Sequence, residues 1–228
     1  MITRCIRGFV VVAVAGALAA SSTVGAGAAT KSSSSDTAIA KQGVLVSADF
    51  PAEWTATPSK ASSDAATEKV AATIPDCKQY IVFEKSVKAV PRAKSPDFDL
   101  GNSSISNTTS VFTNAARATA AMRVFQSSKT ESCINKLFSK LVTTKDVTFT
   151  GHIQSVALGV GSQSVGYAGT ITASSSASNT QTFGVGLFAI RTGRGVGMYS
   201  YFSDTDETTV LSDAINTSMT RFQAALAA

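Results

Sequence analysis

The chain has 228 residues, of which 44% are hydrophobic and 15% are charged. This composition is typical of a protein with a hydrophobic core, and it excludes a chain that is disordered throughout. The formal net charge is +5, and the basic residues are not interleaved with aromatic ones, so we expect no nucleic-acid partner.

Residues 1–28 have the features of a secretory signal. Arg4 and Arg7 precede the apolar stretch 9–20, and the small residues Ala26-Gly27-Ala28 form a cleavage site. The apolar stretch is shorter than the roughly 20 residues of a membrane-spanning helix. We therefore predict a secreted protein, outside the cytoplasmic membrane, whose mature chain has no membrane span and a net charge of +3.

Residues 29–42 are polar and lack hydrophobic periodicity, which predicts a flexible Ser-rich leader. We expect a single domain over residues 43–228. Near its start, Trp54 is predicted to lie in the core or at its edge, in a short strand.

The segment between this strand and the C-terminal half is predicted to be mostly helical. A helix begins at Ser62 and ends at Pro75. Residues 79–112 combine short apolar patches with turn-forming residues, which predicts one or two strands and an exposed loop. Apolar residues then recur at helical spacing in residues 115–126 and 128–141, which predicts two more helices.

Basic residues cluster in and around this predicted strand-and-loop region. They indicate either a surface for an acidic partner or an ordinary solvated segment. The four residues are Lys85, Lys88, Arg92 and Lys94.

From Val147 to Phe202 apolar and polar residues alternate, which predicts four antiparallel strands joined by hairpins. One face of this sheet is expected to be apolar, and the other to be polar and exposed. The polar face carries Thr148, Thr150, His152, Gln154, Thr170, Thr172 and Thr182.

A closing amphipathic helix begins near Asp204, and its apolar stripe is expected to cover the apolar face of the sheet. The predicted fold class is therefore α+β, with an antiparallel β-sheet that forms a meander in the C-terminal half and packs against several α-helices.

Two cysteines remain after removal of the signal, Cys77 and Cys133. An even pair in an oxidising compartment predicts one disulfide, and closing a loop of this length contributes roughly 4 kcal/mol to stability. We expect no metal site, because neither cysteine lies in a C-x-x-C unit or near the only histidine.

The sequence contains no nucleophile motif of the common serine hydrolases, and we expect neither an enzyme nor a cofactor. The exception to test is a hydrolase that uses His152 or the paired carboxylates Asp97 and Asp99.

The order of these features resembles a known family. The features are an export signal, Phe50-Pro-Ala-Glu-Trp54, Pro75-Asp-Cys77, an Ala-rich helix that leads to Cys133, and Arg191-Thr-Gly-Arg-Gly195 near the end of the meander. In this order they resemble the extracellular sensor-domain superfamily of actinobacteria, typified by the C-terminal domain of PknH-type receptor kinases. The resemblance covers most of residues 43–228, and it implies a sheet flanked by helices, a ligand cleft and no catalytic residues. The chain departs from the kinase domains in having one cysteine pair instead of two.

These features predict a secreted, non-catalytic, sensor-like binding module for a small molecule, a cell-envelope component or a protein. Aromatic and arginine side chains often anchor interfaces, so Arg194, Tyr199 and Tyr201 are the predicted contacts. The alternative is an extracytoplasmic carrier of a lipid or another apolar ligand, which requires a cavity between helices and sheet.

Overall fold

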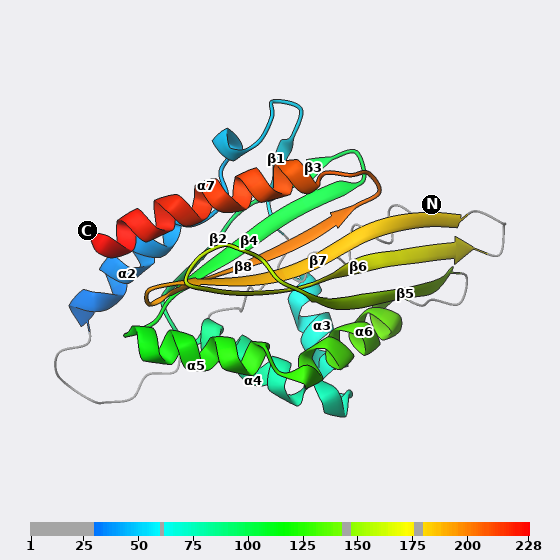
Figure 1. The fold of residues 1–228 in the computed structure, drawn as a ribbon, viewed down its shortest axis with the longest axis horizontal. Helices are drawn as coiled ribbons and strands as arrows, with labels where there is room; N and C mark the ends of the chain where they lie inside the picture. The colour runs from blue at the N-terminus through cyan, green and yellow to red at the C-terminus, as the bar shows by residue number, and fades with distance from the viewer. Residues whose placement is uncertain (1–29, 60–61, 143–146, 176–179) are drawn as a thin grey trace.

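The computed structural model describes residues 30–59, 62–142, 147–175 and 180–228. These residues fold into an antiparallel sheet with helices on both of its faces (Figure 1), which confirms the predicted α+β class. The predicted signal peptide lies outside the described residues. Within the described ranges, no helix is both long and apolar enough to cross a membrane.

The eight strands of the sheet pair antiparallel in the order β1-β3-β4-β8-β7-β6-β5, and β2 pairs with β4. The last four strands form the predicted meander, and β8 returns beside β4. The strands are β1 (Thr55–Thr57), β2 (Arg92–Lys94), β3 (Asp97–Leu100), β4 (Ser103–Val111), β5 (Val147–Val156), β6 (Gln163–Ser175), β7 (Thr180–Thr192) and β8 (Gly195–Ser203).

The helices lie on either side of this sheet (Figure 1). The predicted helices at 62–75, 115–126 and 128–141 are confirmed as α3, α5 and α6. Asn114 begins α5, because its side chain accepts a hydrogen bond from the Arg117 N–H at 3.0 Å. The helices are α2 (Thr30–Gln42), α3 (Ser62–Ala71), α4 (Lys78–Lys88), α5 (Ala115–Phe125), α6 (Ser128–Val142) and α7 (Thr208–Ala227), with short 3₁₀ turns η1 (Ser47–Asp49) and η2 (Pro75–Cys77).

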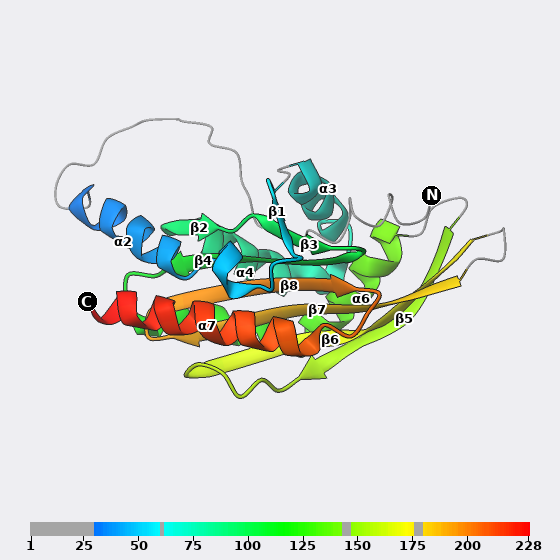
Figure 2. The ribbon, with the colours of Figure 1, turned by 90° about the horizontal axis from the view of Figure 1, so that it is seen from above.

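Each face of the sheet has its own hydrophobic core. Under α4, α5 and α6, the Phe125 ring lies 4.6 Å from the Phe83 ring and 5.2 Å from the Tyr167 ring. Under α2 and α7, Phe222 packs with Ile105 and other buried residues of the sheet. Figure 2 shows α7 running along the strands that it covers.

The prediction that the closing helix covers the apolar face of the meander is wrong. The residues that predicted this face, such as Ile153 and Val185, belong to the core under α4–α6, whereas Leu211 and Ile215 of α7 belong to the opposite core. The run 185–190 is apolar almost throughout, because β7 is buried on both faces there.

The predicted flexible leader is an ordered helix from residue 30 onward. Ala40 of α2 is fully buried, and its carbonyl accepts a hydrogen bond from Thr109 Oγ1. Asp36 forms an ion pair with Arg194 at 2.7 Å. Serine is a weak helix former, so these tertiary contacts override local propensity, and the domain starts before residue 43.

The prediction for residues 79–112 is wrong in two places. Residues 78–88 form α4, and the Asn/Ser/Thr-rich run is the central strand β4 instead of an exposed loop. The buried side chain of Asn107 accepts from the Leu45 N–H at 2.8 Å and donates to the Gly43 carbonyl at 3.0 Å. These partners are distant in sequence, and they satisfy polar groups that would otherwise be costly to bury.

The predicted disulfide is present. Cys77, at the end of η2, is bonded to Cys133 of α6 across a sequence separation of 56 residues. Both cysteines are fully buried. The predicted burial of Trp54 is confirmed too, since the residue is 7% exposed and its ring lies 5.3 Å from that of Phe50 at the edge of the second core. Contrary to the prediction, Trp54 lies just before β1 and not in a strand.

Candidate binding pocket

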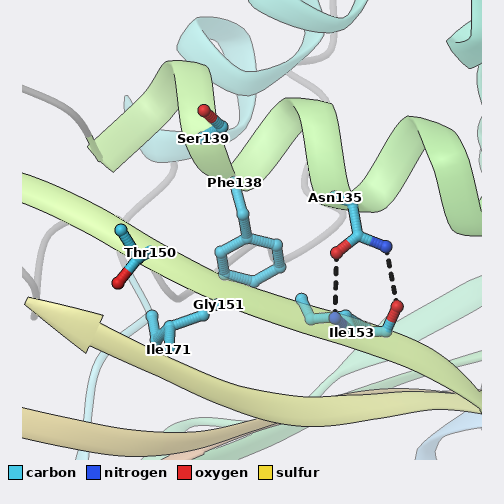
Figure 3. Close-up of a pocket in the computed structure, with 7 residues that line it drawn as sticks. All are labelled: Asn135, Phe138, Ser139, Thr150, Gly151, Ile153 and Ile171. Carbon is cyan, nitrogen blue, oxygen red and sulfur yellow. Dashed lines mark hydrogen bonds between the residues drawn. The ribbon is translucent and has the colours of Figure 1, made fainter.

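The edge strand β5 is covered along part of its length by α6. The Ser155 N–H donates to Glu131 Oε2 at 3.0 Å. The Ile153 N–H donates to Asn135 Oδ1 at 2.8 Å, and Asn135 Nδ2 donates to the Ile153 carbonyl at 2.7 Å (Figure 3). An edge strand has backbone groups without a neighbouring strand, and here helix side chains pair with them.

Along this edge, the polar side chains of α6 and the backbone groups of β5 that they bind have similar spacings. Glu131 and Asn135 lie four helix residues apart, about 6 Å along the axis, and their partners lie two strand residues apart, about 6.8 Å. The next turn of α6 brings Phe138 toward β5, while Ser139 points away from the strand (Figure 3). Within the described chain, α6 therefore pairs no polar side chain with the following edge position, Gly151.

The backbone of Gly151 points toward α6 by the alternation of an antiparallel ladder. The Ile153 and Ser155 N–H groups point away from β6, so the N–H and C=O of Gly151, two residues earlier, do as well. No group among the described residues pairs with them. A side chain here is excluded, since a Cβ on Gly151 would lie 2.3 Å from the Thr170 carbonyl oxygen.

A pocket lies at Gly151, where the hydrogen bonds between α6 side chains and the β5 backbone end. Its cavity volume is about 30 Å³, room for roughly two water molecules. A pocket that holds a whole small molecule has about 300 Å³ or more, so this one fits a single group of a ligand. Its walls combine apolar side chains with backbone and hydroxyl groups, from Asn135, Phe138, Ser139, Thr150, Gly151, Ile153 and Ile171.

The sheet surface beside the pocket is uncharged and rich in hydroxyl groups. The residues predicted to form the polar face are exposed or half-buried, which confirms that prediction. Thr150, Thr172 and Thr182 lie opposite one another on adjacent strands, and the last two hydroxyls are 3.3 Å apart. Residues 147–190 contain no Asp, Glu, Lys or Arg. This surface offers hydrogen-bonding groups but no formal charge.

The predicted contact residues lie elsewhere, and both tyrosines among them are buried. Tyr199 is fully buried under α7 with its hydroxyl 2.7 Å from that of Ser218, and burial raises the pKa of Tyr199. Tyr201 is 7% exposed. Arg194 bonds Asp36 and the Phe112 carbonyl, so it holds α2 to the sheet.

The candidate catalytic residues do not meet. His152 is exposed on β5, whereas Asp97 and Asp99 lie on β3, with four strands between them. Burial raises the pKa of Asp97 and the nearby Lys94 opposes this, while Asp99 accepts from Thr57 Oγ1 at 2.7 Å. In the ranges that the structure covers, no group of three His, Cys, Asp or Glu could hold a metal ion.

The predicted basic cluster does not form one exposed patch. Lys88 forms ion pairs with Glu68 and Glu84, while Arg92 and Lys94 are half-buried on β2. Lys85 is exposed at the end of α4. These four side chains therefore form neither an exposed basic surface nor a uniformly solvated segment.

The pocket residues Asn135, Phe138 and Gly151 are not among the residues predicted from the sequence. A signal for them exists, because a glycine inside a strand often marks a close backbone approach. Which helix lies against that strand is not visible in the local pattern.

The chain shows little similarity to known proteins. No family model matches the chain, and no curated protein matches it. Among solved structures, the extracellular domain of PknH from Mycobacterium tuberculosis is similar at 11% identity and a TM-score of 0.38, over 65% of this chain and 75% of that chain. A TM-score this low does not establish a common fold, so the resemblance to the sensor-domain superfamily stays a prediction.

Proposed function

We propose that the chain is a non-catalytic binding module that holds one polar group of a larger ligand in the pocket between α6 and β5. The observation that carries this proposal is the interrupted pairing of the β5 edge. Two successive edge positions, Ser155 and Ile153, are paired by α6, and the third, Gly151, opens into a cavity. The neighbouring hydroxyl-rich face offers further contact surface to the rest of the ligand.

The proposed place of action is outside the cytoplasm. The predicted export signal supports it, and so does the buried Cys77–Cys133 disulfide, because such bonds form and persist in oxidising compartments. Ligands from that environment are small molecules, cell-envelope components and exposed proteins.

The carrier alternative has less support. A carrier of an apolar ligand requires an apolar cavity of several hundred Å³. The two described cores are instead filled by packed rings, such as the Phe183–Phe202 stack at 4.6 Å, and the described pocket measures about 30 Å³.

A nuclear magnetic resonance titration of the ¹⁵N-labelled, oxidised protein tests the binding function. Small polar molecules and cell-envelope fragments are added, and the expected result is saturable shifts at Asn135, Gly151 and Ile171. Thr150→Tyr places a ring beside the pocket at an exposed strand position and should abolish the shifts. The matched control Thr150→Val keeps the side-chain shape and should retain them.

Two results would overturn the proposal. In the first, every ligand found shifts residues far from the pocket, and Thr150→Tyr leaves its affinity unchanged. In the second, a ligand is chemically converted during the titration, and conversion stops in His152→Ala or Asp97→Asn, which would establish an enzyme.

A further inference from the structure

We infer that the group bound in the pocket is a peptide unit, so that an extended, uncharged peptide adds to the β5 edge at Gly151. This inference rests on the proposed binding function and specifies its ligand class. In such a complex the peptide N–H donates to the Gly151 carbonyl, and the peptide carbonyl accepts from the Gly151 N–H.

The first support is the way in which Asn135 binds β5. Its carboxamide oxygen accepts from the Ile153 N–H and its nitrogen donates to the Ile153 carbonyl (Figure 3). The nitrogen also donates to the Glu131 carbonyl within α6 at 3.0 Å. A residue of a neighbouring antiparallel strand would pair with Ile153 through the same two groups. The edge therefore keeps the geometry of a strand-pairing surface, with a side-chain amide in the place of a strand.

The second support is the pocket at the next position. In strand addition, main-chain hydrogen bonds supply affinity, and pockets beside the edge select side chains. The rings and methyl groups of Phe138 and Ile171 form apolar walls, and the cavity volume is about 30 Å³. That space suits a small apolar side chain, such as the methyl group of alanine, next to the paired peptide unit.

The third support is the contrast between the two edges of the sheet. At the opposite edge, β1 has three residues and Pro58 follows it, and short strands and prolines protect an edge against strand addition. β5 has ten residues and contains neither proline nor a charged residue. Because residues 147–190 carry no formal charge, the sheet offers a charged peptide no counter-charge, and an uncharged one is favoured. Glu131 of α6, the acidic side chain bonded to this edge, is already paired with the Ser155 N–H.

The test uses the smallest probe that offers one residue of extended backbone, N-acetyl-L-alanine N′-methylamide. The control probe carries a methyl group on the alanine nitrogen and so lacks that N–H donor. The ¹⁵N-labelled full domain is titrated with each. The alanine probe should shift the Gly151 amide resonance saturably with a Kd of about 1–10 mM, and the methylated probe should bind at least about tenfold more weakly. Thr150→Tyr should remove the shift and Thr150→Val should keep it.

The outcomes separate this inference from the proposed function. Equal binding of both probes, or binding of acetate in their place, would overturn the peptide class and leave the pocket as a binding site. Shifts at Gly151 that depend on protein concentration without any probe, with a dimer in sedimentation, would replace the peptide by a second copy of the chain. Failure of these probes together with all envelope fragments would overturn both proposals.

Discussion

Replacing Asn135 by alanine removes the side chain that pairs with the β5 edge, and the structure sets the size of the effect. Two hydrogen bonds to Ile153, of 2.7 and 2.8 Å, are lost, and each contributes about 1 kcal/mol net. A third bond of Asn135, to the Glu131 carbonyl at 3.0 Å, lies within α6. The adjoining pocket admits water to the freed Ile153 groups, which offsets part of the loss. We expect the free energy of unfolding to fall by about 1–2 kcal/mol.

Urea unfolding of the oxidised protein, followed by circular dichroism, measures this change. Ser139→Ala is the matched control on the same helix, because Ser139 is exposed, and its unfolding free energy should stay within about 0.5 kcal/mol of the parent value. Asn135→Asp keeps an acceptor for the Ile153 N–H but sets a carboxylate against the Ile153 carbonyl. This variant should be less stable than the parent at pH 7 and recover at acidic pH, where the protonated acid can donate.

Equal stability of Asn135→Ala and Ser139→Ala would refute this role of Asn135. In that case water would replace the carboxamide at no cost, and α6 would not stabilise this edge. The same variant also bears on ligand binding. Because it frees the Ile153 position, the alanine probe should bind it at least as well as it binds the parent.

Three further predictions concern the rest of the domain. Replacing both Cys77 and Cys133 by alanine should lower the free energy of unfolding by about 4 kcal/mol, since the bond closes a separation of 56 residues, and an unchanged urea midpoint would contradict this. Arg221→Ala should lower the free energy of unfolding by about 2–3 kcal/mol, because it leaves the buried Asp49 carboxylate without its guanidinium partner. Thr220→Ala, one residue away and exposed, is the control, and equal stability of the two variants would count against the ion pair. Tyr199→Phe should cost about 1 kcal/mol at pH 7 through the lost bond to Ser218. Burial raises the pKa of Tyr199, so the native state keeps the Tyr199 proton above pH ~10, where tyrosines of the unfolded state ionise. The contribution of Tyr199 to stability is therefore complete below that pH and falls above it. Tyr199→Phe should lose less stability between pH 7 and 11 than the parent does.

Local patterns predicted the elements whose neighbours in sequence are their neighbours in space. The four strands from residue 147 onward pair with one another in chain order, so their alternation and turn residues were sufficient. The same holds for α5, where Asn114 caps a helix that begins at the next residue.

Prediction failed where distant contacts override local preference. The serine-rich α2 is held by Thr109 and Arg194, and the polar strand β4 is paired and satisfied by β8 and by residues near Gly43. Tyr199 and Tyr201 of β8 were predicted contacts, but both are buried, and only the packing of α7 decided that this face of the strand is covered.

The sequence by itself determined the α+β class, the meander, the disulfide partners and the uncharged surface of residues 147–190, because each depends on residue types and local spacing. Only the tertiary structure decided which face each helix covers and where the β5 edge stays unpaired. The pocket exists because Phe138, and not a polar side chain, follows Asn135 by one turn against a strand position that must be glycine. The position of Phe138 opposite Gly151 results from the packing of a helix against a strand, and the residue spacing within either element does not predict it.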